Sequence, residues 1–337
     1  MSIYFFGGVI LLQKNHPSID VLVLENDSEH ILLHGSDPYG KDVTHEDIYS
    51  SSRSDMYGPG VAANGRVKLG FPYPPLTLLW ILPGYLLGDV RYSFLLAVVL
   101  TTLMLFYSEP DLNGFAAAIL FLFVPDTVFV LRFGWTEPLM VMTVAATVIA
   151  ARRGSKWLPV ALGLFFASKQ YSVLAVPLVA LLLSEFSWKA YSFLLAKACA
   201  VAALINVPFL LWDPRGFWWS LVGFRLLVPL RLDALSFSAL LARHGHHPIP
   251  QWFVLLAVIA AIGFALAKAP RTPAGFAVSL GLVSLIFFVL NIGAFCNYYF
   301  FCGGVLCLGI SGAAYDSSET LFAVVELPHS ATGNVLL

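Results

Sequence analysis

Apolar runs separated by short polar turns follow one another along the chain from Pro75 to Ile310. Only 12% of the residues are charged and 58% are hydrophobic, whereas a soluble globular protein carries about 25% charged residues. So few charges could not cover the surface of a water-soluble fold, but apolar side chains can face lipid directly. The sequence therefore predicts an all-α polytopic membrane protein with about eight to ten helices in the bilayer.

Four regions divide the chain. Residues 1–12 are interpreted as a partial first transmembrane helix, because the apolar run is shorter than the about 20 residues of a span and lacks the flanks of a signal peptide. We expect the start of that helix to be absent from the sequence. Residues 13–73 form a long polar loop that holds many of the acids, with a short helix around Leu22–Leu33. Residues 74–315 form the multi-helix transmembrane domain, and residues 316–337 form a polar C-terminal tail.

Several apolar segments are too short to cross about 30 Å of hydrocarbon unaided. Pro75–Leu87 begins at a proline pair and is interpreted as a half-helix at the interface. Short helices are tolerated where protein or a water-filled cavity satisfies the backbone, so we expect the bundle to contain a cavity. The other expected helices are Arg91–Tyr107, Gly114–Leu131 with a break at Pro125, Pro138–Ala151, Trp157–Ala167, Tyr171–Leu183, Ala190–Leu211, Trp252–Ala267, Ala274–Leu290 and Tyr298–Ile310.

Lysine and arginine residues in short loops indicate the orientation in the membrane, because such loops favour the cytoplasmic side. Arg152, Arg153 and Lys156 share one loop, and Lys268 and Arg271 share another. Placing both loops in the cytoplasm puts the first long loop and most other polar turns outside. The expected location is a cell inner or plasma membrane, with the site on the extracytoplasmic face.

Charge and cysteine content argue against two classes of function. The net charge is −1, and the chain has no basic stripe that could neutralise nucleic-acid phosphates. The cysteines lie in apolar stretches without a CxxC pair or a histidine at ligand spacing, which indicates buried or lipid-facing residues rather than a zinc or disulfide set. These cysteines are Cys199, Cys296, Cys302 and Cys307.

Ionisable residues at the membrane boundary are costly, so a functional role is the first hypothesis for each. A cluster of both signs could bind a charged polar ligand such as a sugar phosphate, or its members could form ion pairs that hold broken helices together. The outer-face set is Asp20, Asp37, Glu137, Lys169, Asp213, Arg215, Arg225, Arg231 and Asp233.

Asp20 follows the first apolar run closely and would lie near the membrane surface. A carboxylate there could act as a general base on an acceptor hydroxyl. The alternative is a helix N-cap, a position that Asp favours strongly, and spacing alone favours the cap.

Aromatic residues flank two rigid turns of the long loop. Asp37 and Tyr39 lie in a turn rich in glycine and proline, and Phe71 and Tyr73 precede the proline pair at Pro74. The rings could stack on a sugar, or they could belong to an interfacial aromatic belt.

Glu137 and Lys169 carry the strongest sign of a site. Glu137 begins a short helix, where the helix dipole stabilises an acid, and Lys169 lies next to Gln170 between two apolar runs. A lysine there needs an anionic partner, either Glu137 or a ligand phosphate. The sequence contains no Walker loop, GxSxG, HExxH or dinucleotide motif, and the histidines at 244, 246 and 247 are interpreted as a solvated loop.

Together these segments resemble the GT-C superfamily, the integral-membrane glycosyltransferases that use polyprenyl-phosphate sugars, and especially its bacterial mannosyltransferase-like members. The likeness covers nearly the whole chain. It depends on the order and spacing of short motifs, which are Asp20, His34–Tyr39, Phe71–Leu76, Gly88–Tyr92, Gly134–Pro138 and Lys169–Tyr171.

The resemblance implies a GT-C-like bundle whose first long loop supplies a catalytic Asp as general base, a role that maps onto Asp20. Basic residues, here Lys169 and Arg231, would meet the donor phosphate, and displacement at the sugar C1 would invert its configuration. Many relatives carry two adjacent acids at the loop start, whereas Val21 follows Asp20 here. The expected substrate-binding residues are Asp37, Tyr39, Tyr73, Glu137, Lys169, Gln170, Arg231 and Asp233.

The leading hypothesis is a cell-envelope glycosyltransferase that moves a mannose-type sugar from a polyprenyl phosphate to a lipid or glycan acceptor. The alternatives are a transporter or flippase of a lipid-linked or anionic substrate, and an inactive membrane scaffold on the same fold. A transporter usually shows internal repeats with paired broken helices, and none is evident. We expect no tightly bound metal or cofactor, and a weakly bound divalent cation stays an open alternative.

Overall fold

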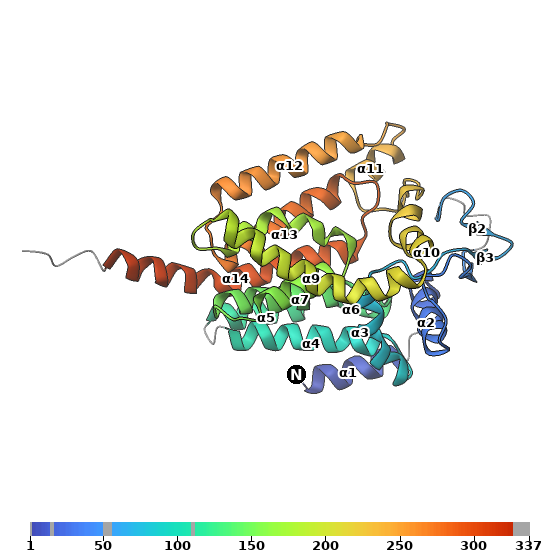
Figure 1. Cartoon of the computed structure of the whole chain (residues 1–337), viewed down its shortest axis with the longest axis horizontal. Coiled ribbons are helices and arrows are strands. Elements are labelled where there is room, and N and C mark those ends of the chain that lie inside the picture. The colour runs from blue at the N-terminus through green and yellow to red at the C-terminus, as the bar shows by residue number, and fades with distance from the viewer. Residues whose placement is uncertain (1, 14–16, 50–55, 109–111, 326–337) are drawn as a thin grey trace, which may run out of the picture.

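Long helices run side by side along the longest axis of the molecule (Figure 1). The computed structural model describes residues 2–13, 17–49, 56–108 and 112–325. At one end of the bundle lie α2 (Asp20–Leu33), α10 (Pro214–Trp218) and a small antiparallel sheet, while the C-terminal helix points away from the other end. The polar elements expected on one side of the membrane therefore lie together.

The order of the elements follows the expected helices closely. The sheet has the strand order β1-β3-β2. The remaining elements are α1 (Ser2–Gln13), β1 (His45–Glu46), β2 (Ala62–Ala63), β3 (Arg66–Val67), α3 (Pro75–Leu86), α4 (Arg91–Ser108), α5 (Leu112–Leu122), α6 (Asp126–Arg132), α7 (Glu137–Arg152), α8 (Leu158–Phe166), η1 (Gln170–Ala175), η2 (Pro177–Leu182), α9 (Trp188–Trp212), η3 (Trp219–Gly223), η4 (Phe224–Leu226), α11 (Phe237–Arg243), α12 (Gln251–Lys268), α13 (Pro273–Leu290) and α14 (Cys296–Val325).

Two segments differ from expectation. The expected helix at 171–183 consists of two 3₁₀ helices, and Pro177, which lacks a backbone N–H, begins the second. Helix α14 continues to Val325, through the first part of the segment interpreted as a C-terminal tail, and residues 326–337 lie outside the described part of the chain.

Several helices are apolar enough to cross a membrane. Among the described residues, α9, α12 and α13 pass a test of length and hydropathy alone. The pairs α3–α4 and α5–α6 pass it together, with bends of 109° and 51°. The sharp bend after α3 fits the half-helix that the proline pair predicted. The apolar helices make the chain a multi-pass membrane protein.

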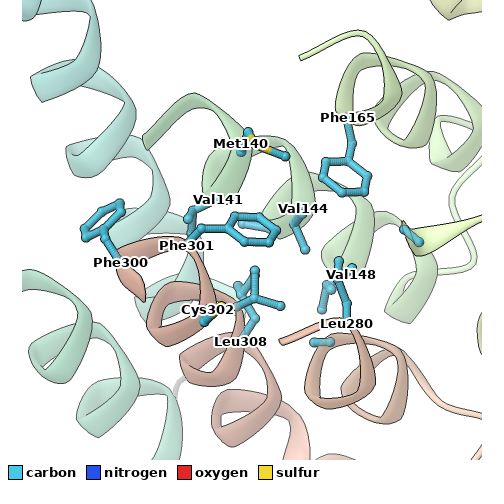
Figure 2. Packing of buried hydrophobic residues seen from close by; sticks show 14 of the residues in the cluster. Met140, Val141, Val144, Val148, Phe165, Leu280, Phe300, Phe301, Cys302 and Leu308 are labelled. Atoms are coloured by element: carbon cyan, nitrogen blue, oxygen red, sulfur yellow. The ribbon is translucent and has the colours of Figure 1, made fainter. Parts of the chain in front are cut away.

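Helix α7 lies at the centre of the core and packs against α4, α8, α13 and α14. Figure 2 shows Met140, Val144 and Val148 of this helix facing Phe165 and Phe301 from its neighbours. All five side chains are fully buried. By contrast, α9 and α12 expose most of their apolar surface, which suits lipid-facing helices.

The second part of the long loop, from Pro38 to Tyr73, folds into a lobe whose two ends are tied together. The Phe71 N–H donates to the Pro38 carbonyl at 2.9 Å, and the Tyr39 hydroxyl donates to the Tyr73 carbonyl at 2.7 Å. Tyr39 is fully buried, with its ring against Phe71 and against aromatic residues of α9 and α10. The lobe is thereby anchored to the end of the bundle.

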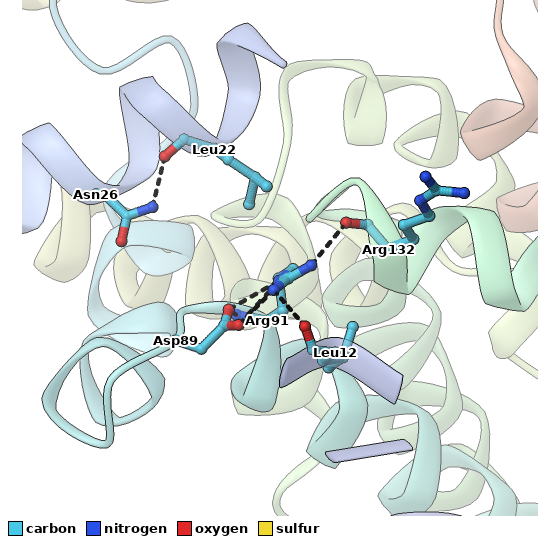
Figure 3. Close-up of polar contacts among 6 residues, drawn as sticks. All are labelled: Leu12, Leu22, Asn26, Asp89, Arg91 and Arg132. Carbon is cyan, nitrogen blue, oxygen red and sulfur yellow. Dashed lines mark hydrogen bonds and ion pairs between the residues drawn. The ribbon is translucent and has the colours of Figure 1, made fainter. Parts of the chain in front are cut away.

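Arg91 is a second anchor (Figure 3). Its buried guanidinium pairs with Asp89 at 2.6 Å. It also donates to the Leu12 carbonyl at 2.9 Å, near the end of α1, and to the Arg132 carbonyl at 3.1 Å, at the end of α6. One side chain thus fixes the positions of three segments next to α2.

Replacing Arg91 with methionine should lower stability markedly, because it removes the guanidinium group from the Asp89 carboxylate and from two carbonyl groups. Breaking a buried ion pair in this way costs about 3–5 kcal/mol. Thermal unfolding in detergent measures the loss, with Arg153→Met as the exposed-arginine control. Equal midpoints for the two variants would contradict the anchoring role.

Candidate functional site

The carboxylate of Asp20 lies half-buried at the beginning of α2. The N-cap position belongs to Ile19, so the alternative of an Asp20 N-cap is wrong. The Asp20 Oδ1 atom accepts the Val21 N–H at 2.9 Å and the Tyr49 hydroxyl at 3.3 Å, and Tyr57 also hydrogen-bonds this carboxylate. Two tyrosines of the lobe therefore hold the acid in place.

Burial raises the pKa of Asp20 above its ordinary value, although the Val21 N–H, the charge of Arg231 and the two tyrosine hydroxyls act in the opposite direction. Burial, followed by the nearby Asp20 charge, also raises the pKa of Tyr49 to about 12. Tyr49 consequently stays a hydrogen-bond donor at neutral pH. A carboxylate with a raised pKa is a stronger proton acceptor, which suits a general base.

A second cluster forms around the buried ion pair of Lys169 and Glu137, the pair that the sequence indicated. The Lys169 Nζ atom also donates to the Thr136 hydroxyl at 2.8 Å. The Tyr171 hydroxyl donates to the paired Glu137 oxygen at 3.3 Å. The other Glu137 oxygen is buried with no hydrogen-bond partner in the described part of the chain.

Three tyrosine rings surround the Lys169 ammonium. Its Nζ atom lies 4.9 Å from the Tyr73 ring centroid and 5.6 Å from those of Tyr171 and Tyr298. Aromatic faces attract a cation at such distances. The cage orients the lysine side chain in a buried position.

Two arginines connect the lysine cage with Asp20. Arg225 lies 5.8 Å from the Tyr73 ring centroid. Arg231 pairs with Asp233 at 2.6 Å and lies close enough to both Asp20 and Tyr298 to act on them electrostatically. The acid, two guanidinium groups and the caged lysine thus occupy one region at the lobe end of the bundle.

Other residues expected in the site make structural contacts. Tyr39 is fully buried, and its hydroxyl donates to the Tyr73 carbonyl. Gln170 donates to the Pro72 and Leu221 carbonyls at 2.9 and 3.1 Å. Asp37 closes its turn by accepting the Tyr39 N–H at 2.9 Å. Asp213 caps α10, and these N–H contacts lower its pKa.

Sequence reasoning missed the tyrosines at 49, 57 and 298, because nothing local marks a tyrosine as lying beside a charge that is distant in sequence. It also passed over Glu25 and Glu29, which are fully buried on α2. Their spacing of four residues was a usable signal, since residues four apart share one helix face.

The described residues contain no group of three or more His, Cys, Asp or Glu that could hold a metal ion. His244, His246 and His247 are exposed, as expected of a solvated loop. All four cysteines are free thiols.

No protein-family model matches the sequence, and no curated protein matches it significantly. The fold is similar to that in the crystal structure of ArnT from Cupriavidus metallidurans bound to undecaprenyl phosphate, with a TM-score of 0.59 at 14% sequence identity. This likeness decides the architecture. The chain has a GT-C-like fold.

The match covers 96% of this chain but 62% of that chain. The GT-C-like fold therefore includes the lobe, the half-helix and the bundle described above. It confirms the architecture that the sequence motifs predicted. Proposals about the sugar and the acceptor depend on the residues of the site.

Proposed function

We propose that this protein transfers a sugar from a polyprenyl-phosphate donor to a hydroxyl group of a lipid or glycan acceptor. The reaction takes place at the extracytoplasmic face of a cell inner or plasma membrane. The observation that carries the proposal is the half-buried Asp20 carboxylate beside Arg231, at the same end of the bundle as the caged Lys169. The undecaprenyl phosphate bound to the similarly folded ArnT supports this class of donor.

In the proposed reaction, Asp20 takes the proton of the acceptor hydroxyl as its oxygen attacks the sugar C1. A new C1–O bond forms on one face of the sugar while the bond from C1 to the phosphate oxygen breaks on the other, so the configuration inverts. Polyprenyl phosphate leaves with the bonding electrons. A positioned general base contributes about 10²–10⁴-fold to such a rate.

The leaving phosphate gains negative charge, which the cationic residues would stabilise. Arg225 is exposed and Arg231 is partly exposed, and their planar donors suit phosphate oxygens. Lys169 would give up part of its contact with Glu137 and contact the phosphate instead. Tyr73 and Tyr298 would flank the donor, and Asp233 would keep Arg231 oriented. A mannose-type sugar is our first choice of donor group, from the sequence resemblance.

The decisive experiment uses the purified chain in lipid nanodiscs with undecaprenyl-phosphate-linked mannose, glucose or galactose. Membrane lipid extracts serve as the acceptor. The expected result is a glycosylated acceptor with inverted configuration, together with one released undecaprenyl phosphate for each product. A nucleotide sugar, as the control donor, should yield no product.

A parallel assay in liposomes measures whether the same lipid-linked sugars change leaflet. Movement across the bilayer without release of undecaprenyl phosphate would favour the transporter alternative over the enzyme. Neither movement nor product from any donor would contradict the proposed function and favour an inactive scaffold.

A further inference from the structure

One face of α2 turns acidic side chains toward the protein interior. Leu24, Glu25, Ser28 and Glu29 are buried on this helix. Asp20 begins the same helix about 7.5 Å along its axis from Glu25, at 1.5 Å per residue. The usual occupants of a buried helix face are apolar, so these polar residues need an explanation.

Both carboxyl oxygens of Glu25 are buried, and neither has a hydrogen-bond partner in the described part of the chain. The same holds for the oxygens of Glu29. Leaving a buried acceptor unsatisfied costs about 1–3 kcal/mol, and more for a charged group. A chain that retains such groups uses them for a ligand or keeps them neutral.

The two glutamates have different surroundings. Burial raises the pKa of Glu29 to about 8, so this group is largely a neutral acid at neutral pH. Burial raises the pKa of Glu25 well above its ordinary value as well, and the nearby positive charge of Lys169 is the largest influence in the opposite direction. Glu25 is therefore the acid of this face that belongs to the charged site.

The turn before α7 allows the Glu25 side chain to pack directly against it. Gly134 has a φ of +66°, and a Cβ atom built there would lie 3.2 Å from the Glu25 carboxyl oxygen and 2.3 Å from the Leu22 side chain. Any other residue would be strained at this positive φ, and its Cβ atom would force the Leu22 side chain to move. The backbone is thus shaped to bring Glu25 to the Lys169 cluster.

We propose that Glu25 is the sugar-recognition residue of the donor site, accepting hydrogen bonds from hydroxyl or ammonium groups of the donor sugar. This inference rests on the proposed function. The phosphate would lie at Lys169, whose charge acts on Glu25, so a sugar linked to that phosphate would lie within reach of the Glu25 side chain. A carboxyl group offers several acceptor lone pairs, and an O–H donor as well when it is protonated, which suits the adjacent hydroxyl groups of a sugar ring.

The test separates sugar contacts from phosphate contacts. In nanodiscs, the dissociation constant of undecaprenyl phosphate is divided by that of undecaprenyl-phosphate-linked mannose, glucose or glucosamine. In the wild type we expect this ratio to reach at least 10 for one sugar or more. Preference for glucosamine indicates an ammonium contact, and preference for a neutral sugar indicates hydroxyl contacts.

Glu25→Gln should reduce the ratio to near 1 while changing the affinity for undecaprenyl phosphate less than twofold. Glu29→Gln, one helical turn further from Asp20, is the matched control and should keep the wild-type ratio. If Glu25→Gln does not fold, Glu25→Asp retracts the same carboxyl group and should also lower the ratio.

Three results would overturn the inference while leaving the proposed function intact. They are a wild-type ratio near 1 for every sugar, an unchanged ratio in both Glu25 variants, and equal losses for undecaprenyl phosphate with and without sugar. The last would mean that Glu25 supports Lys169 rather than the sugar. Failure of the wild type to bind undecaprenyl phosphate would instead contradict the proposed function itself.

Discussion

Asp20→Asn should lower the rate of sugar transfer by about 10²–10⁴-fold, the contribution of a positioned general base. The amide keeps the size of the side chain and one acceptor oxygen for the Tyr49 hydroxyl, so the lobe should stay in place. It cannot take a proton from the acceptor. Initial rates with a polyprenyl-phosphate-linked sugar measure the loss, and thermal unfolding checks that the variant is folded.

The affinity of Asp20→Asn for undecaprenyl phosphate provides the internal control, and it should stay close to that of the wild type. Asp42 is an exposed acid of the same lobe, so Asp42→Asn should transfer sugar at the wild-type rate. A folded Asp20→Asn enzyme with full activity would remove Asp20 from the mechanism and direct attention to Glu137.

The acidic limb of the pH–rate profile is a further test of the role of Asp20. A general base works only when it is ionised, so kcat/KM should fall as the pH falls through the Asp20 pKa. Because burial raises that pKa above its ordinary value, the fall should begin at a higher pH than for an exposed aspartate. Asp20→Asn should lose this limb of the profile.

Lys169→Met should have the second large effect, on stability and on binding together. It removes the cation from the fully buried Glu137 carboxylate, and an uncompensated buried charge costs about 3–5 kcal/mol. It also removes a proposed phosphate ligand. Thermal unfolding and undecaprenyl phosphate binding, both in nanodiscs, measure the two losses separately.

The double variant Lys169→Met with Glu137→Gln distinguishes the two roles of the lysine. Removing both charges should restore most of the stability, because no charge is then left alone in the core. Binding of the phosphate should stay weak. If the double variant recovers affinity as well as stability, Lys169 holds the fold together and does not bind the phosphate.

Much of the fold could be predicted from the sequence because apolar runs in lipid must be helical. The break at Pro125 is confirmed, because α5 ends at Leu122 and α6 begins at Asp126, and α3 begins at Pro75 as the proline pair indicated. The 3₁₀ geometry after Lys169 could not be foreseen. An apolar run indicates burial and length, whereas the choice between helix types depends on the packing of neighbouring helices.

The site was predictable where a charge lies in an apolar context. Glu137 and Lys169 had to find partners, and they are paired with each other. Polar and aromatic residues gave weaker signals, because their roles depend on distant partners. Tyr39 has the local pattern of a surface turn, yet it packs against Phe209 and Phe217, which lie far along the chain.

The tie between the two ends of the lobe bears on how such a protein could diversify. The hydrogen bonds between Phe71 and Pro38 and between Tyr39 and Tyr73 close the lobe at its base, and His45 within the lobe contacts Asp27 of α2. Tyr49 of the lobe donates to Asp20. In the proposed reaction, a change in the lobe would therefore reach the general base through Tyr49 and alter acceptor preference without changing the residues proposed to bind the donor.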